Sequence, residues 1–198
     1  MMRSNPAKQK LAAGGTAYGT MVFEFNSPGL PSALVAAGAE ALAMPCNTAH
    51  HYAPAIKAAV KVPFLDMVEL AVRRAAELAG VDGRVGILAS PALRKIGLFD
   101  APFARFGVQA LYPEDEAAML AAIRRIKAAG PVPEATLAVR AASDALLRRG
   151  AEVQMIACTE FSLLVGATAN GVTAFDTLDM LVAAIKGFAT GDGKGAGR

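Results

Sequence analysis

Short apolar runs alternate along the chain with longer amphipathic stretches. The apolar runs predict strands at 20–25, 40–44, 62–67, 84–89, 108–111, 153–157 and 172–175. The stretches between them predict helices between 5 and 14, between 29 and 38, and at 50–60, 70–78, 91–106, 115–129, 134–149 and 178–188. Strands separated by helices are typical of parallel sheets with right-handed crossovers. The predicted fold class is therefore α/β, in two lobes that join near 81–84.

Composition and charge exclude several classes of protein. Although 54% of the residues are hydrophobic, no stretch reaches the roughly 18 uninterrupted apolar residues that a membrane span needs. The net charge of +3 is scattered along the chain, so neither a nucleic acid nor a membrane is expected as a partner. The start of the chain lacks the pattern of a secretory signal, and a cytoplasmic protein is expected.

The chain contains two cysteines, Cys46 and Cys158, and each follows an apolar predicted strand. Their separation excludes a CxxC motif and a zinc knuckle, so free thiols are expected. The residues that follow are polar in both segments: Asn47 and Thr48 after the first cysteine, Thr159 and Glu160 after the second. Because ligands of open α/β sheets bind beyond the carboxyl ends of the strands, this repeated layout predicts a binding site at both thiols.

The position of the cysteines suggests acid/base chemistry. Each precedes a predicted helix, whose N–H groups and dipole lower the pKa of a thiol, so a thiolate is expected near neutral pH. The side chains of Asn47, Thr48 and Thr159 can hold a carboxylate. Two thiols facing one carbon can remove a proton from one face and deliver another to the opposite face, which inverts a stereocentre without a cofactor. No cluster of metal-ligating residues is apparent.

From about residue 37 to 190 the chain resembles the aspartate/glutamate racemase family, whose members racemise amino acids without a cofactor. The resemblance rests on PCNTAH at 45–50 and CTE at 158–160, and on VPFLDMVE at 62–69, RVGILAS at 84–90 and FDT at 175–177. It implies that the two cysteines are the acid/base pair. It also implies that Asn47, Thr48 and Thr159 contact a small amino or dicarboxylic acid. Glu160 is expected to contact this ligand only secondarily.

The resemblance also implies a domain organisation. Two similar lobes with mainly parallel sheets hold the site in the cleft between them, and members are often homodimers. The first lobe is expected at 1–82 and the second at 83–171; residues 172–190 return to the first lobe, and 191–198 form a flexible tail.

The first 40 residues depart from that family. They resemble the start of the HpcH/HpaI metal-dependent 2-keto-acid aldolases, on NPAKQKL at 5–11, GTMVFEF at 19–25 and SPG at 27–29. Within the first lobe, only 41–82 is then racemase-like, and the usual first strand, its Gly-rich turn and the following helix are expected to be missing. The later catalytic histidine and metal ligands of the aldolases have no counterpart here, so aldolase activity is not expected.

Other polar residues near the motifs have plainer interpretations. Glu160 is expected to cap the helix after the second cysteine. His50 and His51 are expected to cap a helix or to be partly exposed, and Lys127 is expected on a solvated helix face.

Two further hypotheses stay open. In the first, the chain is another isomerase of the superfamily, such as a hydantoin racemase or a maleate isomerase. In the second, it is a non-catalytic chimeric relic. A decarboxylase of malonate derivatives is less favoured, because the superfamily performs that reaction with one cysteine. Neither the substrate nor the oligomeric state follows from the sequence.

Overall fold

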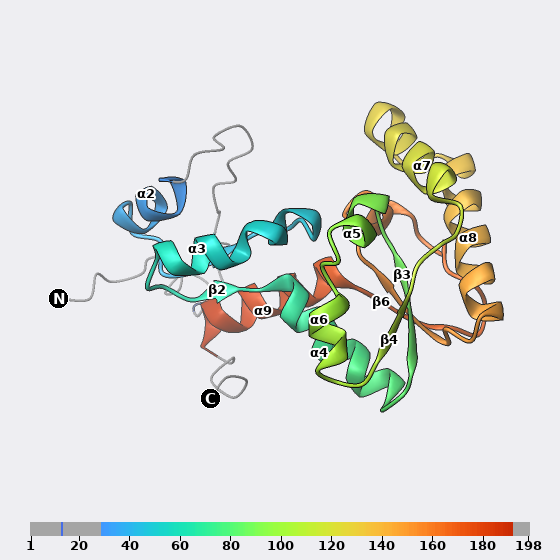
Figure 1. The fold of residues 1–198 in the computed structure, drawn as a ribbon. Helices are drawn as coiled ribbons and strands as arrows, with labels where there is room; N and C mark the ends of the chain where they lie inside the picture. The colour runs from blue at the N-terminus through green and yellow to red at the C-terminus, as the bar shows by residue number, and fades with distance from the viewer. Residues whose placement is uncertain (1–12, 14–28, 192–198) are drawn as a thin grey trace. The chain divides into compact units, whose positions relative to one another are not determined.

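The computed structural model describes residue 13 and residues 29–191 (Figure 1). The predicted first helix, the predicted strand at 20–25, most of the aldolase-like segment and the tail beyond 191 lie outside the described residues. The described chain forms two compact units: the first contains residue 13 with 29–43, 52–65 and 181–191, and the second contains 44–51 and 66–180. Among the described residues, no helix has the length and hydropathy needed to cross a membrane.

The second unit is built on a four-stranded parallel sheet. Its strands are β3 (Arg84–Leu88), β4 (Gln109–Leu111), β5 (Val153–Ile156) and β6 (Thr173–Asp176), in the order β4-β3-β5-β6. The central strands β3 and β5 pair from Val85↔Val153 to Leu88↔Ile156. They are mostly buried because helices cover both faces of the sheet. The sheet confirms the predicted α/β class.

The helices of this unit form two cores, one on each face of the sheet (Figure 1). They are α4 (Met67–Ala79), α5 (Pro91–Lys95), α6 (Asp100–Ala104), α7 (Glu116–Ala129), α8 (Pro133–Arg148) and the start of α9 (Thr177–Thr190), with the 3-10 helices η1 (Thr48–Tyr52) and η2 (Phe161–Leu163). Val72 of α4 and Phe103 of α6 pack with Ile87 in one core. Ile123 of α7 and Val139 of α8 pack with Leu88 in the other core.

Helix α4 has a clear start and a clear end. The Asp66 carboxylate precedes it and accepts hydrogen bonds from Val68 N and Glu69 N at 2.9 and 3.1 Å. Gly80 ends it with a positive φ of 71°, a conformation that glycine adopts without strain. Burying each valine or leucine of its apolar face contributes about 1.5–3 kcal/mol. The start of α4 is therefore held at a defined place against the sheet.

A buried polar network connects α8 with β5. The amide of Gln154 donates to the backbone oxygens of Ser143 and Ala151 at 2.9 and 3.2 Å, and the Ser143 hydroxyl donates back to the Gln154 side chain. The same hydroxyl accepts a hydrogen bond from Ala169 N. Since both side chains are fully buried, these bonds avoid the penalty of about 1–3 kcal/mol that an unsatisfied polar group carries.

The first unit contains a smaller parallel sheet and short helices. These are α2 (Leu30–Ala36), β1 (Leu42–Ala43), α3 (Ala53–Ala59) and β2 (Phe64–Leu65). The two strands pair as Leu42↔Phe64 and Ala43↔Leu65. They are shorter than the predicted strands at 40–44 and 62–67. Because β1 and β2 run in parallel, the segments that leave their carboxyl ends start side by side.

Three predicted helices differ in the structure. The helix predicted at 91–106 is divided into α5 and α6 around Gly97, whose φ of +62° interrupts helical geometry. The helix predicted at 50–60 starts as the 3-10 helix η1, and its α-helical part begins at Ala53, where Pro54 fits the first turn. The helix predicted after the second cysteine is only the three-residue η2.

The structure also groups two segments differently from the predicted lobes. Residues 172–190 were expected to return to the first lobe, yet β6 is hydrogen-bonded to β5, whose backbone groups would otherwise lack partners on that side. Only the part of α9 from Leu181 onward belongs to the first unit. Helix α4, expected in the first lobe, covers a face of the four-stranded sheet.

Candidate active site at the two cysteine segments

Polar residues stand where three parallel strands end. Ser90 follows β3, Cys158 follows β5, and Asp176 is the last residue of β6. The carboxyl ends of parallel strands meet at the same edge of a sheet, which is the edge where ligands of open α/β proteins bind. Cys158 therefore lies at the carboxyl edge of the sheet, and binding of a ligand there stays a prediction.

The Cys158 thiol is buried and hydrogen-bonded. Its Sγ donates to Glu160 Oε2 at 3.1 Å, and the residue is 9% exposed. Burial, followed by the hydrogen bond and the negative charge of Glu160, raises the pKa of Cys158 to about 12. The expected thiolate is therefore wrong for this residue, since burial and a neighbouring carboxylate outweigh the dipole of the short η2. Cys158 is a protonated thiol at neutral pH.

The Glu160 carboxylate connects this thiol to a lysine. Lys127 Nζ lies 3.2 Å from Glu160 Oε1, and Thr159 Oγ1 lies 3.5 Å from Glu160 Oε2. Partial burial acts to raise the pKa of Glu160, but the hydrogen bonds from Cys158 and Lys127 lower it below its usual value. Glu160 was expected to cap a helix; its side chain makes no capping bond and pairs with these two groups instead. Lys127, expected on a solvated face, is mostly exposed but paired.

Cys46 has a different environment. It follows β1 by three residues, its backbone N–H donates to Met44 O at 2.9 Å, and its side chain is exposed. Thr48, two residues later, begins η1. The Cys46 sulfur is therefore open to reagents in a way that the Cys158 sulfur is not.

A chain of hydrogen bonds fastens the Cys46 segment to the strand that leads to Cys158. Asn47 Nδ2 donates to Thr177 Oγ1 at 2.9 Å, and Thr177 Oγ1 donates to Ile156 O at 3.0 Å. Asn47 and Thr177 are 2% and 1% exposed. Asn47 Oδ1 is buried and has no hydrogen-bond partner in the described part of the chain. The amide is thus oriented with an acceptor that no described group uses, which makes this oxygen a candidate to accept a hydrogen bond from a ligand or a water molecule.

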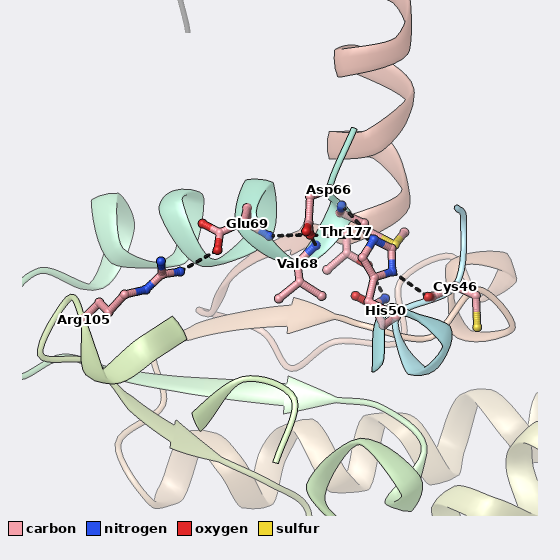
Figure 2. Close-up of polar contacts among 9 residues, drawn as sticks. Cys46, His50, Asp66, Val68, Glu69, Arg105 and Thr177 are labelled. Atoms are coloured by element: carbon pink, nitrogen blue, oxygen red, sulfur yellow. Dashed lines mark hydrogen bonds and ion pairs between the residues drawn. The ribbon is translucent and has the colours of Figure 1, made fainter. Parts of the chain in front are cut away.

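His50 contacts the backbone of Cys46 and that of Met67. Its Nδ1 is 2.8 Å from Cys46 O, and its Nε2 accepts a hydrogen bond from Met67 N at 3.1 Å (Figure 2). Asp66 Oδ1 lies 3.7 Å from Nε2. His50 is 3% exposed, so the expectation of partial exposure is wrong for this residue and holds only for His51, which is exposed.

Asp176 lies beside the Cys158 segment. Its Oδ1 accepts a hydrogen bond from Leu178 N at 2.7 Å, and burial raises its pKa although Ser162 and Leu178 donate to it. Ser162 Oγ also lies 3.4 Å from Cys158 O. Asp176 therefore supports both the start of α9 and the turn that carries the second cysteine.

The structure connects some of the predicted site residues and adds others. Cys158, Thr159 and Glu160 form one cluster, while Asn47 ties the Cys46 segment to β5 through Thr177. Residues that contact these segments and that sequence analysis did not assign to the site are His50, Asp66, Lys127, Asp176 and Thr177. A signal for three of them was present, because the VPFLDMVE and FDT strings carry Asp66, Asp176 and Thr177. The roles of the predicted site residues stay predictions.

The fold is similar to that of solved racemase structures. A candidate Asp/Glu racemase from Yersinia pestis matches with a TM-score of 0.70 at 24% identity, over 82% of this chain and 71% of that one. An aspartate racemase from Picrophilus torridus matches at 0.63 and 21%, over 80% and 65%. A glutamate racemase from Bacillus anthracis matches at 0.62 and 14%, over 87% and 69%. At these identities the likeness establishes the fold alone.

A sequence family also matches most of the chain. The model of the Asp/Glu/hydantoin racemase family covers residues 27–185. The match begins inside the 1–40 segment that resembles aldolases, and that aldolase-like character stays a prediction. Both cysteine motifs and all the contacts described above fall within the matched range. The chain belongs to the Asp/Glu/hydantoin racemase family.

Proposed function

We propose that this chain is a cofactor-independent racemase of a small amino acid, with Cys46 and Cys158 as the acid/base pair. Family membership supports a racemase. The observation that carries the proposal is the hydrogen-bond chain from Asn47 through Thr177 to Ile156, because it ties the residue beside one cysteine to the strand leading to the other.

In this mechanism the two sulfurs start in different protonation states. The thiolate of Cys46 removes the α-proton, and the electron pair of the C–H bond moves onto the α-carbon and the carboxylate. Cys158, a thiol in the free protein, delivers its proton to the opposite face. The products are the opposite enantiomer, a Cys46 thiol and a Cys158 thiolate, so every proton is accounted for.

The neighbouring polar groups bind the substrate. Asn47 Oδ1, which lacks a partner among the described residues, accepts a hydrogen bond from the substrate ammonium group. Thr48 and Thr159, with nearby backbone N–H groups, hold the carboxylate, whose charge grows as the proton leaves. Glu160 contacts the ligand only secondarily, because its oxygens already pair with Cys158 and Lys127.

The reverse reaction starts from a Cys158 thiolate, which burial and Glu160 disfavour. The equilibrium constant between free enantiomers is one, so kcat/KM is equal in the two directions. We therefore expect kcat and KM to differ between the enantiomers by the same factor. Equal kcat values for the two enantiomers would contradict this assignment of the free-protein proton.

The test is exchange of the α-proton in D₂O, followed by ¹H NMR with chiral analysis of the product. Substrates are L- and D-aspartate, L- and D-glutamate, neutral amino acids, a 5-substituted hydantoin and maleate. Exchange accompanied by inversion of an amino acid is the expected result. Activity on the hydantoin or on maleate alone would assign one of the other isomerase functions.

The control is the Val165→Ala variant, which alters a 96% exposed side chain and should keep wild-type rates. Folded wild-type protein that exchanges none of these compounds would overturn the proposal and favour a non-catalytic relic. Thermal denaturation with each compound shows whether such a protein still binds one.

The same proposal includes a cellular location, a ligand class and an assembly for the protein. Thiol acid/base chemistry needs reduced cysteines, so we place it in the cytoplasm, with a small amino or dicarboxylic acid as its ligand and no nucleic-acid or membrane partner. A homodimer is the proposed assembly, and light scattering after size-exclusion chromatography measures it directly.

A further inference from the structure

We propose that His50 is a positioning residue for Cys46: its neutral ring bridges the Cys46 carbonyl and the first N–H of α4, and so holds the catalytic sulfur in place. The inference rests on the proposed function of Cys46 as an acid/base group. The ring lies between these two backbone groups (Figure 2), and it is almost completely buried.

The two contacts of the ring determine which nitrogen carries the proton. Met67 N can only donate, so Nε2 accepts and is unprotonated. In a neutral imidazole the hydrogen then sits on Nδ1, which donates to Cys46 O at 2.8 Å. Asp66 Oδ1 lies 3.7 Å from Nε2, farther than Met67 N, whose hydrogen bond Nε2 accepts.

Helix α4 supplies the rigid partner. Asp66 Oδ1 accepts from the N–H groups of Val68 and Glu69, and His50 Nε2 accepts from that of Met67, so the first turn of the helix is capped by two different segments. Met67 and Val68 are themselves buried, which holds this end of the helix in the core. The ring is therefore attached to a fixed element and not to a mobile loop.

A second contact holds the Cys46 segment as well. The Cys46 carbonyl belongs to the peptide group that joins Cys46 to Asn47, and the Asn47 side chain is held by Thr177. This peptide group is thus constrained from two directions, while the sulfur remains exposed. Proton transfer requires such constraint, because a displacement of about 1 Å can lower a rate by about 10²-fold.

Two substitutions separate the two contacts of the ring. In His50→Asn, the amide nitrogen occupies a position near that of Nδ1 and can still donate to Cys46 O. In His50→Gln, the amide oxygen lies near the position of Nε2 and can still accept from Met67 N. Both variants keep a polar group in the buried site, so they form a matched pair.

We expect His50→Gln to lower kcat by about tenfold to a hundredfold with little change in KM, and His50→Asn to retain kcat within about fivefold of wild type. A merely structural histidine would predict equal losses in both variants, or losses that follow their melting temperatures. Either of those results, or a greater loss in His50→Asn, would overturn the inference.

Two measurements do not depend on turnover. Long-range ¹H–¹⁵N NMR of the wild-type protein should show the His50 hydrogen on Nδ1; a hydrogen on Nε2 would overturn the inference even if neither variant folds. Alkylation of Cys46 by iodoacetamide, followed by mass spectrometry, should change in rate in His50→Gln and not in His50→Asn. Equal alkylation rates in the two variants would also overturn it.

These readouts distinguish the inference from the proposed function. If the wild-type protein exchanges no substrate proton, the proposed function fails, while the NMR and alkylation results still show whether His50 holds Cys46. If exchange occurs but the two variants behave alike, only the inference about His50 fails.

Discussion

The two cysteine segments share a sequence layout, yet the structure gives them opposite environments. Cys46 is exposed, and its backbone is held by His50 and, through Asn47, by Thr177. Cys158 is buried, and its own sulfur is held by a carboxylate. One segment thus has a constrained backbone beside an exposed thiol, and the other has a buried thiol with a constrained proton. The proposed mechanism uses both properties, because in it one sulfur starts without a proton and the other with one.

Removing either sulfur should have the largest effect. Cys46→Ser and Cys158→Ser replace a thiol by a hydroxyl, which is a far weaker acid and does not ionise near neutral pH, and each should lower the rate of inversion by about 10²–10⁴-fold. The measurement is inversion of the best substrate found by α-proton exchange. A variant that keeps nearly full activity would show that its sulfur is not part of a pair.

Breaking the connection between the two segments should have the next largest effect. Thr177→Val leaves Asn47 Nδ2 and Ile156 O without their shared hydroxyl, and should lower the free energy of unfolding by about 1–3 kcal/mol. The matched control Thr177→Ser keeps the hydroxyl, so its free energy of unfolding should fall much less. Urea denaturation measures both, and equal stability of the two variants would rule out a role for the hydroxyl.

Removing the negative charge beside Cys158 should make its thiol easier to ionise and to alkylate. Burial raises the pKa of Cys158 first and Glu160 adds to it, to about 12, so the thiolate forms only in strong alkali. Glu160→Gln keeps an acceptor but removes the negative charge; the pKa should fall toward its ordinary value, and alkylation of Cys158 should begin at lower pH. An unchanged pH profile of Cys158 alkylation, measured by mass spectrometry, would contradict the assigned role of Glu160.

The smallest effect is expected at Lys127, whose side chain is 65% exposed. Lys127→Ala removes a cation that helps to lower the pKa of Glu160, so this pKa should rise in a carboxyl NMR titration. A depressed carboxyl pKa stabilises the fold above the unfolded-state pKa, and this stabilisation is lost as pH falls through the folded-state value.

The stability lost in Lys127→Ala should therefore appear at neutral pH and disappear in acid. It should stay below about 1 kcal/mol because the ion pair is largely solvated. Arg124→Ala, an exposed cation on the same helix, is the control, and an equal effect there would indicate a general charge effect.

Much of the second unit was predictable from local patterns. The strands at 84–89 and 153–157 and the helices at 115–129 and 134–149 agree with β3, β5, α7 and α8 to within about one residue at each end. These elements are long or strongly apolar, and their ends carry caps such as Asp115, whose side chain accepts from Ala118 N at 2.8 Å.

The failures of prediction share a cause. The burial of His50 depends on the start of α4, and the place of β6 depends on the open edge of β5. Gly97 divides a helix because its φ is positive, which a periodic apolar pattern does not reveal. Each outcome depends on a contact or backbone angle that no local window of sequence contains.

The sequence by itself determined the alternation of strands and helices and the position of both cysteines just beyond apolar strands, because these follow from residue spacing within short windows. Only the tertiary structure decided which thiol is buried, that Cys158 keeps its proton and which groups contact each segment. A pKa and a fixed position depend on neighbours brought from elsewhere in the chain: Lys127 from α7, Thr177 from 130 residues beyond Asn47, and the start of α4 beside His50.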